Sequence, residues 1–104
     1  MSAVIQRHHY FRLKAPHNAP EERAETARRC RESLATLPGV RGITVGLPAD
    51  DHAEAAWDLT IVMQFETLED IDAYRADPQH RKFVDEILAP RIDVKKIWNF
   101  TTSD

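Results

Sequence analysis

The chain has 104 residues and a formal net charge of −3, so its length predicts one domain, residues 1–104, with a core of its own. The mildly acidic balance gives no basic footprint for a nucleic-acid partner. The single cysteine, Cys30, excludes an internal disulfide framework and a cysteine-based zinc site. No apolar run approaches the ~20 residues that span a bilayer or resembles a signal peptide, so we expect a cytoplasmic protein with no membrane partner.

The sequence of the first half of the chain predicts a strand, a helix and a second strand. A strand over residues 4–14 ends at the loop APHNAP, and Pro20 suits the first position of a helix that extends to about Leu37. Pro38 and Gly39 end this helix, and a strand over residues 40–47 follows. Arginines and glutamates interleave along the helix, which is typical of a solvated face crossed by ion pairs: Glu21, Glu22, Arg23, Glu25, Arg28, Arg29, Arg31 and Glu32.

A polar loop is expected over residues 48–56, followed by the most regular strand of the chain, over residues 57–66. Its residues alternate, which predicts one face toward a core and one polar face with Asp58. The core-facing set is Trp57, Leu59, Ile61, Met63 and Phe65.

Two helical segments and a strand complete the chain. Thr67 is the expected N-cap of a helix whose inner stripe is Leu68, Ile71 and Tyr74. Pro78 disfavours helix at Asp77, so we expect Asp77 to cap a second helix that ends near Pro90. The last strand covers residues 93–101.

The order βαββαβ predicts an α+β, ferredoxin-like fold: a four-stranded antiparallel sheet with both helices on one face. By alternation, four apolar residues point away from the helices, namely Tyr10, Val62, Trp98 and Phe100. An exposed patch of this kind usually marks an interface. We therefore expect a homodimer joined through the sheet faces.

His80 is the leading candidate for catalysis. It occupies the third position of the expected helix, on the side that carries Phe83. The positive end of the helix dipole and an apolar surround both favour a neutral imidazole, which is a free base at neutral pH. The alternative is structural, with the ring tying the helix start to a backbone carbonyl. Tyr74, on the inner face of its helix, is either a second catalytic group or a core tyrosine.

Candidate ligand-binding residues lie on the inner faces of the strands. Arg7 and His9 share a face with Phe11, and Arg7 suits a ligand carboxylate or an enolate oxygen. The alternative for Arg7 is an ion pair with an acid of the helix layer such as Glu86, since a buried unpaired arginine is unfavourable. Ile61, Phe83 and Ile97 complete the expected walls of a small-molecule pocket.

The histidines show no metal-ligand spacing, because His8 and His9 point to opposite faces of a strand and His17 and His52 lie in expected loops. We predict no metal. The sequence also lacks G-x-S-x-G, P-loop and dinucleotide motifs, and no cofactor is expected.

Two stretches, LPGVRGITVG and WDLTIVMQFETLEDIDAYRADPQHRKFVDEILAP, resemble the stress-responsive α/β-barrel family, over nearly the whole chain. The pattern F-x-[ST]-x-E-x-[IL]-x-x-Y-x-x-x-P-x-H is close to a family signature and falls here on Phe65, Thr67, Glu69, Ile71, Tyr74, Pro78 and His80. The resemblance implies a dimeric α/β barrel with a pocket between sheet and helices in each subunit.

The family includes olivetolic acid cyclase, a cofactor-free polyketide cyclase with a histidine base at the position of His80 and a tyrosine at that of Tyr74. In the first strand, the histidine usual in the family is replaced by Arg7. Three functions stay open: a cofactor-independent enzyme for proton abstraction, cyclisation or isomerisation of a small apolar carbonyl compound; a non-catalytic stress-related or ligand-binding dimer; and a monooxygenase of the antibiotic-biosynthesis type, cofactor-free or haem-linked.

Overall fold

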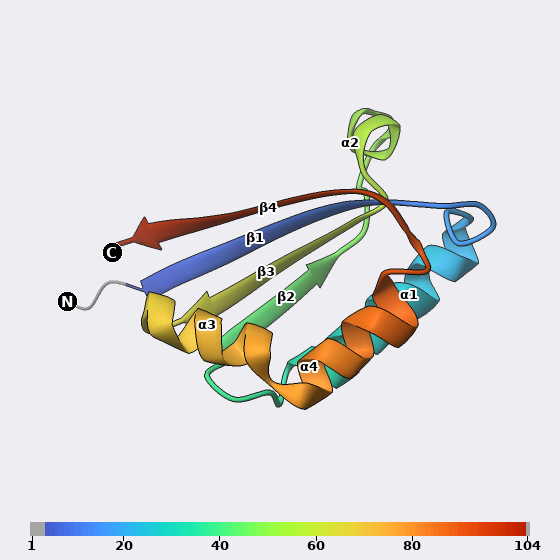
Figure 1. The fold of residues 1–104 in the computed structure, drawn as a ribbon. Helices are drawn as coiled ribbons and strands as arrows, with labels where there is room; N and C mark the ends of the chain where they lie inside the picture. Colours follow the sequence, from blue (N-terminus) through green and yellow to red (C-terminus); the bar gives the residue numbers. More distant parts are fainter. Residues whose placement is uncertain (1–3, 104) are drawn as a thin grey trace.

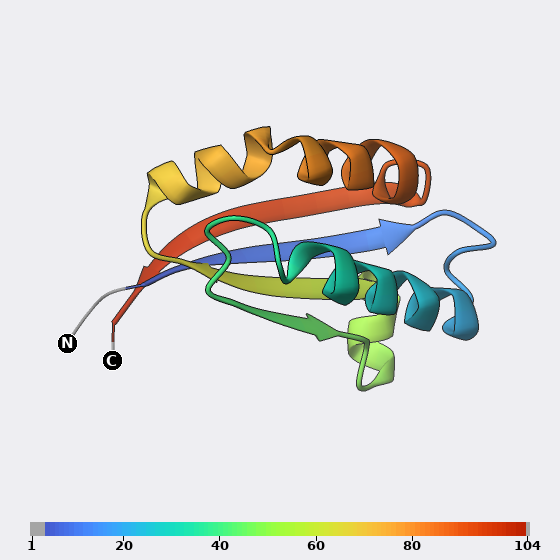
Figure 2. The same ribbon diagram turned by 90° about the horizontal axis from the view of Figure 1, so that it is seen from below.

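The computed structural model describes residues 4–103. Their four strands form one antiparallel sheet with the order β2-β3-β1-β4. The elements in chain order are β1 (Val4–Leu13), α1 (Pro20–Leu34), β2 (Gly42–Gly46), α2 (Asp51–Ala56), β3 (Leu59–Phe65), α3 (Leu68–Ala76), α4 (Pro78–Phe83), the π-helical turn η1 (Val84–Leu88) and β4 (Ile92–Thr102). Helices α1, α3 and α4 cover one face of the sheet (Figures 1 and 2). The predicted ferredoxin-like α+β fold is confirmed.

The core lies between the sheet and the helices. The inner residues of β3, from Leu59 to Phe65, are each at most 1% exposed, as their alternation predicts. From the helix side, α1 contributes Cys30 and Leu34, and α3 contributes Tyr74. Burying a large apolar side chain contributes roughly 1.5–3 kcal/mol, so this layer supplies most of the stabilisation.

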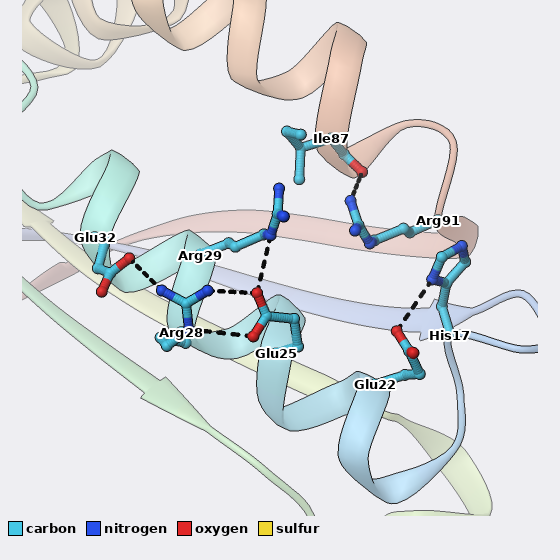
Figure 3. A network of polar contacts seen from close by, with 8 residues as sticks. All are labelled: His17, Glu22, Glu25, Arg28, Arg29, Glu32, Ile87 and Arg91. Carbon is cyan, nitrogen blue, oxygen red and sulfur yellow. Dashed lines mark hydrogen bonds and ion pairs between the residues drawn. The ribbon is translucent and has the colours of Figure 1, made fainter.

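The outer face of α1 carries the expected ion pairs (Figure 3). Arg28 contacts both Glu25 and Glu32, and Arg29 Nε lies 3.1 Å from Glu25 Oε1. These side chains are exposed, and exposed ion pairs contribute little to stability. The helix is therefore held by its inner stripe rather than by its charges.

The segment expected to be a polar loop contains α2. Asp50 is its N-cap and accepts a hydrogen bond from the backbone N–H of Ala53 at 2.8 Å. The alanines of this segment are strong helix formers, so a cap and good propensity outweigh its polar composition. Figure 2 shows α2 at the end of the sheet, and its Glu54 pairs with Arg23 of α1, with 2.9 Å between Oε2 and Nη1.

The expected alternation is wrong at the start of the third strand, because that strand begins at Leu59. Trp57 turns to the outer face, where its ring centroid lies 5.7 Å from that of Tyr10. Asp58 is buried and accepts the backbone N–H of Leu13 at 2.8 Å. The carboxylate thereby satisfies a donor at the end of β1, which holds Asp58 inside.

Two helix expectations also need correction. Leu68 lies outside the inner stripe of α3 and is 57% exposed, since it is the first residue after the N-cap Thr67. Helix α1 ends at Leu34 rather than Leu37, although the Leu37 side chain is still buried. The last helix is not uniform: α4 passes at Val84 into a π-helical turn.

The outer face of the sheet carries the predicted apolar residues. The register places Val62 and Trp98 on either side of His8, and Phe100 beside Gln6. Trp98 is 49% exposed and Phe100 54% exposed. Together with Tyr10, these side chains form what we call the outer patch: Tyr10, Val62, Trp98 and Phe100.

Candidate functional site

A cavity of about 440 Å³ lies between the helices and the β1–β4 side of the sheet. Its walls come from three strands and from α1, α3, α4 and η1. The lining residues are Arg7, His9, Phe11, Leu34, Ile61, Asp72, Tyr74, Arg75, Ala76, His80, Arg81, Val84, Leu88, Ile92, Lys95 and Ile97. This size lies within the range of small-molecule sites.

Seven of the eight residues expected in the site line this cavity. They are Arg7, His9, Phe11, Ile61, Tyr74, His80 and Ile97. Phe83, the eighth, lies in the core and outside the cavity. On the inner side of α4, Phe83 is therefore packed into the core, whereas His80 borders the cavity.

The helix start created by Asp77 positions His80. The Asp77 carboxylate accepts the backbone N–H groups of Gln79 and His80 at 2.9 and 3.4 Å. The His80 ring is half-buried, its centroid 4.3 Å from that of Tyr74. Its Nδ1 lies 3.2 Å from the backbone oxygen of Arg75.

That contact fixes the tautomer of His80. A carbonyl oxygen can only accept, so Nδ1 carries the proton and Nε2 of the neutral ring keeps its lone pair. Burial, opposed by the bond to the Arg75 carbonyl, lowers the pKa of His80. The ring is thus a neutral base at neutral pH.

His9 repeats this arrangement deeper in the cavity. Its Nδ1 lies 3.0 Å from the backbone oxygen of Ile61, which again leaves Nε2 as the acceptor. Burial is the main reason that the pKa of His9 falls to about 4. Arg7 lowers it further, and the hydrogen bond to Ile61 opposes the shift. His9 is therefore uncharged at neutral pH.

Tyr74 lies at the back of the cavity with its hydroxyl 3.4 Å from Met63 Sδ. Burial raises the pKa of this hydroxyl, so it stays protonated. A thioether is a weak acceptor, and the Tyr74 O–H can turn from it to a better one on a ligand.

Arg7 has few partners for a half-buried guanidinium. Its Nη1 donates to Asn99 Oδ1 at 3.0 Å, while its Nε is buried and has no partner. Among residues 4–103, no carboxylate lies within ion-pair distance of Arg7, so the expected pair with Glu86 is absent. Burial, and then the nearby Arg75, lower the pKa of the Arg7 guanidinium.

Sequence reasoning missed the mouth of the cavity. Arg75, Arg81 and Lys95 are exposed there, with Asp72 as the acid among the lining residues. The missed apolar residues are Leu34, Ala76, Val84, Leu88 and Ile92. The alternation of β4 places Lys95 on the same face as Ile97, and this pattern could have identified Lys95 as a lining residue from the sequence.

Among the residues that the structure describes, no group of three or more His, Cys, Asp or Glu side chains is placed to hold a metal. Within the same range no helix is long and apolar enough to cross a membrane.

The family model of the stress responsive A/B barrel domain matches residues 5–99. Among curated proteins none matches the chain. A dabb family protein with a ferredoxin-like fold from Mesorhizobium loti has a TM-score of 0.80 at 16% identity, over 99% of this chain and 100% of that one. A dimeric ferredoxin-like protein of unknown function from Thermobifida fusca has a TM-score of 0.78 at 19% identity, over 98% and 93%.

A hydroxynitrile lyase from Passiflora edulis has a TM-score of 0.77 at 12% identity, over 97% of this chain and 94% of that one. These identities are low, so the structures share the fold with this chain and do not transfer an activity to it.

Proposed function

The chain belongs to the family of stress responsive A/B barrel domains, and from that premise we propose that its cavity performs acid–base chemistry, without a cofactor, on a small and mostly apolar carbonyl compound. The observation that carries the proposal is the Nδ1 contact of His80 with the Arg75 carbonyl, which makes Nε2 the base. The hydroxynitrile lyase with this fold supports an enzyme only by analogy.

In the proposed reaction, Nε2 of His80 takes a proton from the carbon beside the substrate carbonyl. The C–H electron pair forms the new C=C bond, and the carbonyl π pair moves to oxygen as an enolate. The Arg7 guanidinium and the Tyr74 O–H stabilise that oxyanion, because both lie on the walls of the same cavity. The enolate then regains the proton from Nε2 at another carbon, which is isomerisation, or attacks a second carbonyl, whose oxygen takes that proton from Nε2, which is cyclisation.

The natural substrate does not have to be identified before the reaction can be tested. A panel of alkyl and aryl methyl ketones is incubated in D₂O, and loss of the α-proton signals is followed by NMR. We expect the wild type to accelerate exchange for part of the panel. His80→Ala should reduce the accelerated rate by about 10²–10⁴-fold, the usual contribution of a general base. His52→Ala, on α2 and outside the cavity, is the matched control.

A second candidate is a binding protein without catalysis, in which His80 has a structural role. The same contact with the Arg75 carbonyl favours it, because the bond ties the start of α4 to the end of α3. In that case His80→Ala lowers the free energy of unfolding by about 1–3 kcal/mol, and no ketone exchanges faster with the wild type than without protein.

We also propose that the functional unit is a homodimer joined through the outer faces of two sheets. The outer patch supports this assembly, since Trp98 and Phe100 are half exposed in one chain. The structural relative from Thermobifida fusca is dimeric. Closing two sheets face to face would give the α/β barrel.

A further inference from the structure

We infer that the ligand of the cavity is an anion before any reaction begins: a monocarboxylate with an apolar body, whose carboxylate is held by Arg7. The inference rests on the proposed function for the location of the site and adds the class of ligand. A neutral ketone would satisfy the proposed reaction equally well, so the charge of the ligand is a separate question.

The unfilled hydrogen-bonding capacity of Arg7 is the first argument. A guanidinium has five N–H donors, and in Arg7 a single one is engaged by a side chain, through Nη1 and Asn99. The buried Nε has no partner. A half-buried cation whose Nε is shielded from water gains from a counter-ion, and a carboxylate matches the guanidinium fork with two parallel bonds. A neutral carbonyl would leave the charge uncompensated.

The charges that line the cavity point the same way. Arg75 and Lys95 line the cavity and, like Arg7, have no ion-pair partner within residues 4–103. Arg81 lies 4.0 Å from Asp85, and Asp72 is the acid of the lining. The lining thus contains four cationic side chains and one carboxylate, and both of its histidines are neutral. This charge balance favours the binding of anions in the cavity.

The register of the sheet places Arg7 at one end of the cavity wall and Phe11, faced by Lys95, at the other. Across β1 and β4 the facing pairs run from Arg7–Asn99 through His9–Ile97 to Phe11–Lys95. At about 3.4 Å per residue, Phe11 lies about 14 Å along the strand from Arg7. Val84, Leu88 and Ile92 line the cavity as well and are apolar. A carboxylate at Arg7 thus extends its apolar body toward Phe11.

Octanoate and octanamide are the probes for this inference, because they share size and shape and differ in charge. By titration calorimetry at pH 7.5 we expect octanoate to bind wild type about 10-fold or more tightly than octanamide, as a charge-assisted hydrogen bond provides. Arg7→Met should lose this preference and retain octanamide binding. Arg41→Met should keep the preference, since Arg41 is exposed, pairs with Glu66 and lies outside the cavity.

The position of bound octanoate on the protein gives a second readout. Octanoate should shift the backbone amide signals of His80 and Ile97, in the cavity, rather than that of Trp98 on the outer face. Circular dichroism checks that Arg7→Met is folded, and if it is not, Arg7→Gln takes its place.

Three results would overturn the inference. The wild type could bind octanoate and octanamide with equal affinity, octanoate could still bind after Arg7 is replaced, or octanoate could fail to bind the wild type at millimolar concentration. His80-dependent exchange of neutral ketones together with any of these results leaves the proposed reaction standing. Arg7-dependent octanoate binding without His80-dependent exchange leaves the inference standing and removes the reaction.

Discussion

His9 links the cavity to the stability of the fold. Its folded-state pKa of about 4 lies below the unfolded value of 6.5, because burial disfavours the imidazolium. Between these values the unfolded chain binds a proton that the folded chain does not. The stability is therefore complete above pH 6.5 and falls as the pH decreases. The lowered pKa of His80 acts in the same direction.

We expect the wild type to lose about 2 kcal/mol of unfolding free energy between pH 7.5 and pH 5 through His9 alone. Urea titrations at the two pH values measure this loss. His9→Gln should reduce the pH dependence by that amount, whatever its stability at pH 7.5. His52→Gln, in α2, should retain the wild-type loss. A His9→Gln protein with an unchanged pH dependence would contradict the assignment.

The residues of the cavity were predictable where periodicity fixes a face. Alternation along β1 placed Arg7, His9 and Phe11 toward the helices, and helical spacing placed Tyr74 and His80 inward. The partners of these groups were not predictable. Arg7 donates to Asn99, a residue 92 positions away, because the β1–β4 register brings them opposite each other. Pairing register is a tertiary property that a single sequence leaves open.

At the scale of elements, the helix break at Asp77–Pro78 positions the residues of the candidate site. Asp77 accepts two backbone N–H groups at the start of α4, and the same turn places the His80 ring against Arg75 and Tyr74. This start was predictable, because Pro78 disfavours helix at the residue before it and aspartate is a preferred N-cap.

We expect Asp77→Ala to lower the unfolding free energy by about 1 kcal/mol, the usual cost of a lost N-cap. Asp77→Asn should cost only a few tenths, because the amide oxygen still accepts the N–H groups. Chemical denaturation measures both changes. The NMR signals of the His80 ring should also shift more in the alanine variant than in the asparagine variant. Equal stabilities of the two variants would show that the cap contributes little.

Other elements show why pattern alone is insufficient. Composition favoured a loop over residues 48–56, yet Asp50 and the alanines after it form α2. The turn after α2 then reverses the expected faces of Trp57 and Asp58. The π-helical turn had no sequence signal, and it lines the cavity through Val84 and Leu88. Such π-helical turns are frequent at functional sites.

At the scale of the molecule, β4 is an edge strand that one chain leaves largely uncovered. Its inner side chains Lys95 and Ile97 border the cavity, and its outer side chains Trp98 and Phe100 are exposed. The same strand thus supplies one wall of the site and much of the proposed dimer interface. A partner sheet that covers the outer face would fix the position of β4 and hence of the Arg7–Asn99 pair.

Replacing both Trp98 and Phe100 by aspartate should convert the proposed dimer into a monomer, because buried charges without partners are strongly unfavourable in an interface. Light scattering at micromolar concentration measures the change.

Leu68→Asp is the matched control, since Leu68 is also a large exposed apolar residue, at 57%, but lies on α3. Its variant should remain a dimer. A stable dimer interface usually buries at least ~1,200 Å² in total, so we expect the partner sheet also to cover exposed neighbours of the outer patch such as Val94. A wild type that is monomeric at that concentration would contradict the assembly.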